Sequence, residues 1–167
     1  QLNSPTGSAT DDWVGPGGYT ATNAQNPNIS GATIAMNGVY TVSVTNALGC
    51  SATATTTITV NALPTPTANN TGPYCVGSTI QLNSPTGSVT DDWSGPGGYI
   101  ATNVQNPNIP GATTAMSGVY TVTVTNVLGC SATATTTVTV NALPTPTANN
   151  TGPYCVGNTI QLNSPSG

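Results

Sequence analysis

Residues 118–141 read Gly-Val-Tyr-Thr-Val-Thr-Val-Thr-Asn-Val-Leu-Gly-Cys-Ser-Ala-Thr-Ala-Thr-Thr-Thr-Val-Thr-Val-Asn, and this stretch decides the fold. Apolar and hydroxyl residues alternate in two runs, separated by a short turn at Asn126-Val127-Leu128-Gly129. Because side chains alternate across a strand, one face of each run is apolar and the other is rich in threonine. β-branched residues fill nearly every position, and no helical stripe of apolar residues fits. The stretch predicts a β-hairpin with one buried and one solvated face. The predicted inward set is Tyr120, Val122, Val124, Ala132, Ala134, Val138 and Val140.

The hairpin recurs at residues 38–61 because the whole chain repeats with a period of 80 residues. Residues 1–80 and 81–160 are identical at all but 11 positions with no insertion, and residues 161–167 begin a third copy. A period of this length suits a small sandwich domain better than one turn of a solenoid. We therefore expect a tandem array of domains, and the given sequence, which begins inside a repeat, is expected to be a window on a longer protein.

Three of the differences between the copies exchange an apolar for a polar residue. A buried site would resist such an exchange, so we expect these side chains to be exposed. The three pairs are Val14/Ser94, Thr20/Ile100 and Ile34/Thr114.

The composition excludes several classes of function. The chain has no Lys, Arg, His, Glu or Phe, and its only charged side chains are Asp11, Asp12, Asp91 and Asp92. Without cationic side chains it cannot neutralise phosphates, which argues against nucleic-acid binding and polybasic membrane attachment. General acid–base and metal-assisted catalysis lose most of their usual residues, so we expect neither an enzyme nor a cofactor. No apolar run approaches the roughly 20 residues that span a bilayer, so no membrane insertion is expected.

Short strands joined by Gly, Pro and Asn turns fill each repeat. The segment Ala62-Leu63-Pro64-Thr65-Pro66 fits both a linker and an edge first strand, since Pro is tolerated where its missing N–H faces solvent. With a boundary near residue 63, the chain contains most of one domain (1–62), a complete domain (64–142) and the first strands of a third (144–167). Seven short strands closed by an alternating hairpin predict an all-β, immunoglobulin-like sandwich.

The complete repeat resembles the immunoglobulin series in three places. These are the second-strand sequence Gly-Ser-Thr-Ile-Gln-Leu, a single Trp, and Ala-Met-Ser-Gly-Val-Tyr-Thr-Val at residues 115–122. The resemblance implies that Trp13 and Trp93 fill the core and that Tyr40 and Tyr120 form tyrosine corners. The positions matching the family's cysteine pair are Ser84 and Val122, so its usual core disulfide is absent.

More closely, the repeat resembles the immunoglobulin- and PKD-like repeats of giant surface adhesins in gliding-type bacteria. The motifs are Tyr-Cys-Val-Gly, Trp-x-Gly-Pro-Gly-Gly-Tyr, Gln-Asn-Pro-Asn-Ile and Gly-Val-Tyr-Thr-Val-Thr-Val-Thr-Asn-x-x-Gly-Cys. The resemblance implies an extracellular, cell-surface location and a structural role as a stalk or filament that gives length and stiffness. The alternative is an adhesive module that binds a glycan or a surface through loop-tip aromatics, since fold alone does not give function.

Two sets of residues are candidates for a ligand site. The pairs Asp11-Asp12 and Asp91-Asp92 offer carboxylates to Ca²⁺, but neighbouring strand residues point to opposite faces and calcium needs about 6–8 oxygens, so a solvated turn is the simpler interpretation. An aromatic platform for a sugar ring is the second candidate, against the simpler expectation that each Trp fills the core. Its members are Trp13, Tyr19, Trp93 and Tyr99.

The four cysteines, one pair per period, are Cys50, Cys75, Cys130 and Cys155. With no His nearby and no Cys-x-x-Cys, zinc is not expected, whereas paired Cys in a chain of this composition favour disulfides in an oxidising, extracellular setting. In immunoglobulin topology Cys75 and Cys130 lie at opposite ends of the domain, about seven strand residues of roughly 3.3 Å apart, whereas a disulfide needs Cα atoms within about 7 Å. We predict a disulfide between domains, joining cysteines 135 residues apart in sequence. A distorted fold linking Cys75 to Cys130, or free thiols, are the alternatives.

The threonine face of the hairpin, residues 133–139 with its twin at 53–59, predicts self-association. Sheets guard their edges with charges, especially Lys, and this chain has only Pro64, Pro66, Pro144 and Pro146 at its first strands. A net charge of −4 over 167 residues gives little repulsion, and each further repeat in register adds to a weak contact. We expect a homo-oligomeric fibre.

Overall fold

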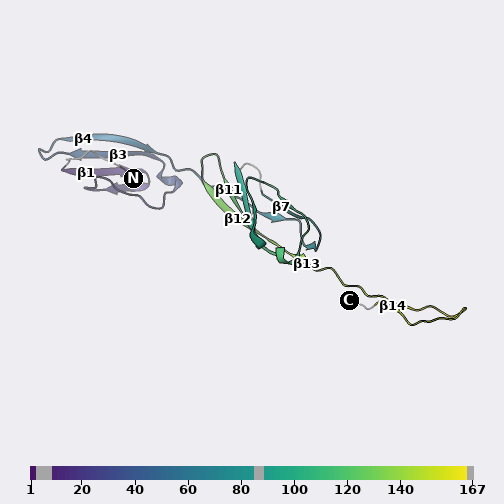
Figure 1. Ribbon diagram of the computed structural model, residues 1–167. Helices are drawn as coiled ribbons and strands as arrows, with labels where there is room; N and C mark the ends of the chain where they lie inside the picture. Colours follow the sequence, from purple (N-terminus) through teal and green to yellow (C-terminus); the bar gives the residue numbers. More distant parts are fainter. Residues whose placement is uncertain (3–8, 85–88, 165–167) are drawn as a thin grey trace. The chain divides into compact units, whose positions relative to one another are not determined.

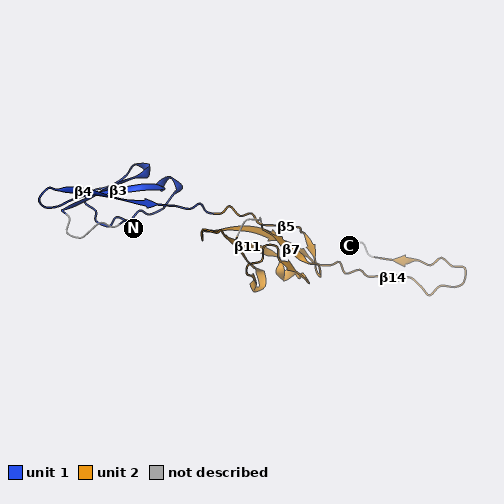
Figure 2. Cartoon of the chain, turned by 90° about the horizontal axis from the view of Figure 1, so that it is seen from above, with its two compact units in different colours: residues 1–63 blue, residues 64–167 orange. Residues whose placement is uncertain are grey.

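The computed structural model describes residues 1–2, 9–84 and 89–164. Contacts between residues divide the chain into two compact units, residues 1–63 (unit 1) and 64–167 (unit 2) (Figures 1 and 2). Each unit is described separately below.

Both units are built from strands and short 3-10 helices. Unit 1 contains β1 (Thr10–Gly15), η1 (Pro16–Gly18), β2 (Tyr19–Ala21), η2 (Ile34–Met36), β3 (Gly38–Thr45) and β4 (Ser51–Ile58). Unit 2 contains β5 (Asn69–Asn70), β6 (Tyr74–Cys75), β7 (Ile80–Asn83), β8 (Thr90–Gly95), η3 (Pro96–Gly98), β9 (Tyr99–Ala101), β10 (Asn108–Ile109), η4 (Thr114–Met116), β11 (Gly118–Thr125), β12 (Ser131–Val138), β13 (Val140–Asn141), β14 (Asn149–Asn150) and β15 (Leu162–Asn163).

Residues 64–142 of unit 2 form a sandwich of two antiparallel sheets. One sheet has the strand order β12-β11-β8-β9 and the other has the order β10-β7-β5. In addition, β13 pairs with β6 in parallel, which joins the end of the last strand to the first part of the domain. The first and the last strand of the sandwich are each split into two short pieces, β5 with β6 and β12 with β13. This arrangement confirms the predicted all-β, immunoglobulin-like fold.

The hairpin at residues 118–141 has the predicted register. β11 and β12 pair antiparallel along their full length, from Gly118 opposite Val138 to Thr125 opposite Ser131. Asn126 closes the turn, because its Oδ1 accepts hydrogen bonds from the amides of Leu128 and Cys130, each at 3.0 Å. Alternation therefore predicted both the pairing and the direction of the side chains.

The core of the sandwich is made by the inward residues of both sheets. Trp93, Tyr120 and Val122 from one sheet pack in a single cluster with Ile80 and Leu82 from the other. All five side chains are at most 1% exposed. Burial of large apolar and aromatic side chains on this scale is the main force that holds such a small domain together.

The position assigned to Ser84 from the immunoglobulin resemblance needs correction. Leu82, which is fully buried, contributes to the core from β7, whereas Ser84 is half-buried and its hydroxyl donates to the carboxylate of Asp91 at 2.6 Å. Strand alternation gives both residues the same side of the strand, and the polar one lies at its end. An apolar Leu82, in one cluster with Val122, fills the core without a disulfide.

Unit 1 repeats the four-stranded sheet of unit 2 with the order β2-β1-β3-β4. Tyr40 lies opposite Thr56, as Tyr120 lies opposite Thr136, so the register is preserved across the repeat. The prediction about the exchanged positions is confirmed, because the apolar member of each pair is exposed. The exposed fractions are 53% for Val14, 53% for Ile34 and 72% for Ile100.

The third copy contributes only β14 and β15, which pair antiparallel through Asn149 with Asn163 and Asn150 with Leu162. This is the register of β5 and β7 in the complete domain. Among the described residues no helix is long and apolar enough to cross a membrane.

Candidate functional site

The Trp and Tyr residues singled out from the sequence lie inside the domains. Trp13 is 3% exposed and Trp93 1%, and each indole N–H donates to a backbone carbonyl of the following loop, that of Ala24 at 3.1 Å or Gln105 at 3.3 Å. These rings anchor a loop to the sheet and present no face to a sugar.

Each buried tyrosine of the hairpin forms a corner. The hydroxyls of Tyr40 and Tyr120 donate to the carbonyls of Met36 and Met116, both at 3.1 Å, four residues upstream. This is the tyrosine-corner geometry of immunoglobulin-like domains. It fixes the short 3-10 helix to the start of the hairpin strand.

Tyr19 and Tyr99, the remaining members of the candidate sugar platform, are half-buried against these corners. Their rings meet those of Tyr40 and Tyr120 edge to face, with centroids 5.6 and 5.7 Å apart. Burial raises the pKa of Tyr99, and burial followed by the charge of Tyr99 raises the pKa of Tyr120. The four rings are structural, and the platform is not formed because its Trp members are buried.

The aspartate pairs have two different environments. Asp11 and Asp91 are 5% exposed, so the interpretation of these residues as part of a solvated turn is wrong. Their neighbours, Asp12 and Asp92, are exposed, and each carboxylate accepts the amide N–H of Asn23 or Asn103 in the next loop, at 2.9 and 2.8 Å. Strand alternation holds the two carboxylates of each pair on opposite faces, and no group of three or more potential His, Cys, Asp or Glu ligands occurs in the part of the chain that the structure describes.

The signal for the buried carboxylates was present in the sequence. Asp91 and Trp93 are two residues apart on one strand, so they share a face, and a buried Trp implies a buried Asp. The hydroxyl of Ser84 is the partner that makes this burial tolerable, because a buried polar group without a hydrogen bond is costly.

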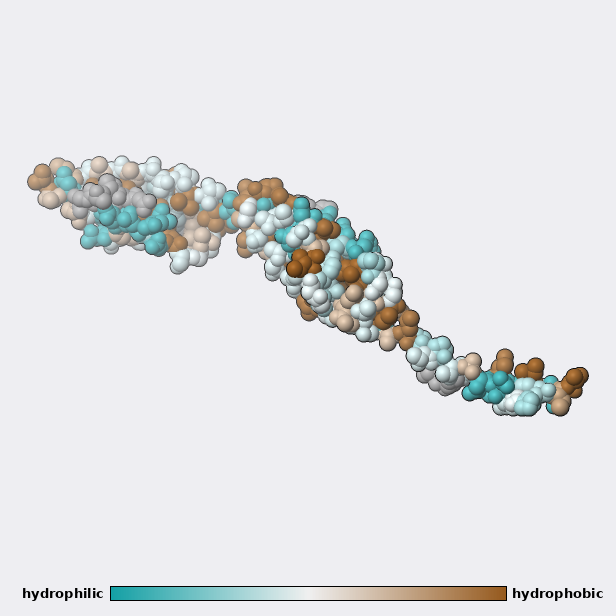
Figure 3. Space-filling view, viewed as in Figure 1, coloured by the Kyte–Doolittle hydropathy of each residue, from teal (hydrophilic) through white to brown (hydrophobic). Residues whose placement is uncertain are grey.

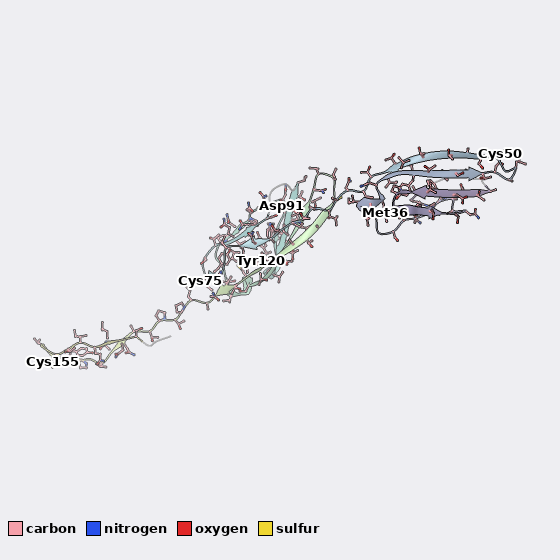
Figure 4. All side chains as sticks on the ribbon, turned by 180° about the vertical axis from the view of Figure 1, so that it is seen from behind. Met36, Cys50, Cys75, Asp91, Tyr120 and Cys155 are labelled. Carbon is pink, nitrogen blue, oxygen red and sulfur yellow. The ribbon has the colours of Figure 1, made fainter. Side chains whose placement is uncertain are left out.

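All four cysteines are free thiols, exposed except for the half-buried Cys130. Cys75 lies opposite Asn141 at the end of the domain where β13 finishes, whereas Cys130 directly precedes the start of β12. Cys50 lies at the tip of the β3–β4 hairpin and Cys155 at the tip of the C-terminal segment (Figure 4). The length of β12 and β13 therefore separates Cys75 from Cys130, and a link between domains stays a prediction.

The most extensive functional surface is the outer edge of the hairpin. β12 and β4 each pair with one strand only in the ladders of the described residues, so each is the edge of its sheet. Along β12 every second side chain is exposed, and these side chains are hydroxyls. They are Ser131, Thr133, Thr135 and Thr137, followed by Thr139 beyond the strand. Unpaired backbone groups beside a row of uncharged side chains can pair with another strand.

Comparison with known proteins gives the fold alone. No protein-family model and no curated protein matches the chain. Similar solved structures include the N-terminal four Ig domains of Dscam1 isoform 1.9, with 19% identity, a TM-score of 0.39 and coverage of 78% of this chain and 37% of that one. The amphioxus IgVJ-C2 molecule has 23% identity and a TM-score of 0.36, with coverage of 81% and 92%. The chain thus spans little more than a third of the Dscam1 structure.

Residues 64–142 are an immunoglobulin-like domain. Its strand order, its buried core with one Trp, and its tyrosine corner support this assignment without the comparisons. The domain presents protein surfaces and edge strands, and we next consider what they can do.

Proposed function

We propose that the chain is part of a stalk or filament of an extracellular, bacterial cell-surface adhesin, a non-enzymatic structural protein that provides length and stiffness. The observation that supports this most is the exact-period repetition of one domain, with the same strand register 80 residues apart and the apolar-for-polar exchanges confined to exposed positions. Each domain has its own core, so a longer array gains length without needing new contacts.

The connection of β6 to β13 supports a role under tension. The chain enters the domain through β5 and β6 and leaves it through β13, and the two ends are joined in parallel. The amides of Tyr74 and Val76 donate to the carbonyls of Thr139 and Asn141, at 2.9 and 3.0 Å. Pulling the two ends apart loads these bonds along the strands, so they share the load and break together.

The uncharged surface supports an extracellular structural role and leaves little chemistry for catalysis. The chain offers no His, Lys, Arg or Glu, and two of its four carboxylates are buried. The glycan-binding alternative has less support, because the Trp rings that would stack on a sugar are 1% and 3% exposed.

Electron microscopy of arrays of two, four and eight complete repeats tests the proposal. We expect the contour length to grow by an equal step for each added repeat and the particles to stay narrow. Compact particles whose longest dimension hardly grows with repeat number would contradict a stalk. Binding of a glycan that is lost on Tyr99→Ala, with the fold intact, would instead favour the adhesive module.

A further inference from the structure

Unit 1 exposes a face that unit 2 covers, although the residues are almost the same. Ala32 is exposed where its counterpart Ala112 is fully buried, and Ile58 is half-buried where Val138 is 1% exposed. Two open hollows follow from this. One is lined by Leu2, Trp13, Val42, Ala54, Thr56 and Ile58, and the other by Pro27, Ile29, Ala32, Met36, Tyr40 and Val60.

In unit 2 this face is covered by residues 69–80. Asn70 Nδ2 donates to Thr136 Oγ1 at 2.8 Å and to the carbonyl of Thr137 at 2.9 Å, beside the amide bonds of β6 to residues 139 and 141. Tyr74 and Ile80 insert into the core with exposed fractions of 7% and 0%. The covering segment therefore supplies both apolar side chains and hydrogen bonds.

The C-terminal segment presents a second, unused copy of this covering piece. Residues 149–160 differ from 69–80 only at Ser78/Asn158. Val156 is 107% exposed and Ile160 65%, whereas Val76 packs against the core and Ile80 is fully buried. Figure 3 shows hydrophobic residues standing at the surface along this segment.

The segment already has the conformation that it would need. The Tyr154 hydroxyl donates to the carbonyl of Gln161 at 2.9 Å, as the Tyr74 hydroxyl donates to that of Gln81 at 3.0 Å. β14 and β15 pair in the register of β5 and β7. A piece that is ordered before it binds loses less conformational entropy on binding.

We propose that residues 144–160 of one chain complete the open face of unit 1 in a second copy, so that chains join head to tail by strand exchange. Asn150 would donate to Thr56, and the amides of Tyr154 and Val156 would donate to the carbonyls of Thr59 and Asn61, by analogy with unit 2. Every one of these residue types is the same in the two copies. The occupant is thus a second copy of this chain.

The inserted piece ends at residue 160 because the next position is already filled. Leu2 of unit 1 is buried, and its amide donates to the carbonyl of Pro27 at 3.2 Å, as that of Leu82 donates to Pro107 at 3.1 Å. A segment preceding residue 1 in a longer chain would compete for the same face. Exchange of this kind needs only the two exposed surfaces, and it holds whether or not the protein is a stalk.

Sedimentation analysis of the 167-residue chain tests the exchange. We expect a mass above 16.5 kDa that rises with concentration. Ile160→Asp places a charge in the joint and should weaken association on the order of 100-fold. Thr159→Asp adds the same charge one residue away, at a position whose counterpart Thr79 is exposed, and should leave association unchanged. Both positions are exposed in the single chain, so neither change should affect folding, which circular dichroism checks.

A mixing experiment separates head-to-tail exchange from other contacts. Ala54→Glu blocks the accepting face and Thr53→Glu is its control, because the counterpart Ala134 packs on the core and Thr133 is exposed. Ile160→Asp and Ala54→Glu chains should each be monomeric alone, and a mixture should form a dimer and nothing larger. A wild-type monomer at all concentrations, a mixture that stays monomeric, or equal effects of Ile160→Asp and Thr159→Asp would overturn the proposal.

A crosslink reports the register of the joint. Cys75 lies opposite Asn141, so Cys155 of one chain should lie opposite residue 61 of another. With the other cysteines changed to Ser, Asn61→Cys should form a disulfide between chains, and Thr53→Cys, exposed on β4, should not. A link between residues 61 and 155 of the same chain would contradict exchange between copies.

Discussion

Gly95 is the residue on which the tyrosine corner of unit 2 depends. A Cβ at this position would lie 2.3 Å from Cδ1 and 2.4 Å from Cε1 of Tyr120. The backbone there is extended, so the need for glycine comes from the close approach of the ring. Gly15 and Tyr40 have the same relation in unit 1.

Replacing this glycine should be severe. Gly95→Ala forces the Tyr120 ring away from its place, and we expect a loss of about 3 kcal/mol in the free energy of unfolding of unit 2. Urea unfolding followed by Trp93 fluorescence, in chains that carry Trp13→Phe, measures this loss. Ser94→Ala, at the exposed neighbouring position, is the control and should change stability by less than about 0.5 kcal/mol. Equal stability of the two variants would contradict the role of the ring.

Alkaline pH should destabilise unit 2 through its tyrosines. The pKa values of Tyr99 and Tyr120 lie above the usual 10.0 in the folded state, so folding favours their protonated forms. Their contribution is fully present below the unfolded pKa and is lost as pH rises from there through the folded values. A variant with all four Cys changed to Ser avoids thiol ionisation near pH ~8.5. In that variant we expect stability to fall above pH 10, together with tyrosinate absorbance, and the fall to be smaller with Tyr99→Phe. Stability that rises through this range would refute the assignment.

At the scale of elements, the hairpin edge is the surface available for lateral association. The exposed hydroxyls of β12 and of β4 lie on edge strands that no charged side chain protects. A Lys on such an edge is the usual means by which sheets avoid pairing with one another.

Thr135→Lys in every repeat should therefore prevent lateral association. We expect wild-type arrays of two, four and eight complete repeats to associate more strongly as repeats are added, because each contact after the first is intramolecular. Analytical ultracentrifugation measures this, and Thr102→Lys, at an exposed position outside the strands, is the matched control. Arrays that stay monomeric at every length and concentration would show that the lateral contact does not exist.

The elements differ in how well the sequence predicted them. The alternation of residues 118–140 predicted the hairpin, its register and its buried face, because a period of two has one structural meaning. The same rule applied to Asp91 and Trp93 would have placed the carboxylate inside, but its charge made a solvated turn the simpler expectation. The position of Ser84 was misjudged because it came from family resemblance, whereas alternation already made Leu82 a core residue.

The open face of unit 1 could not be predicted from the repeat alone. Ala54 and Ala134 have the same neighbours in sequence, yet one is exposed and the other packs against the core. The difference depends on whether a covering segment is present, which is a tertiary property.

At the scale of the whole molecule, the cysteines test how consecutive domains are joined. Cys75 and Cys130 lie at opposite ends of one domain, so we expect oxidised arrays of three complete repeats to contain links between cysteines 135 residues apart in sequence. A non-reducing peptide map identifies them. A map that links Cys75 to Cys130 would sink this prediction, and fully reduced thiols in an oxidising buffer would do so too.

The central claim is that each repeat is an independent domain whose ends are joined by a parallel pair of strands that resists tension. Single-molecule stretching of an array of complete repeats tests it most directly. We predict a series of evenly spaced unfolding events, one for each repeat, each releasing about 280 Å of chain less the folded length, at roughly 3.5 Å per residue for the 80-residue period. Val76→Pro removes the amide that donates to Asn141 and should lower the force of every event. Extension without separate events, or one event that releases the whole array at once, would contradict the account.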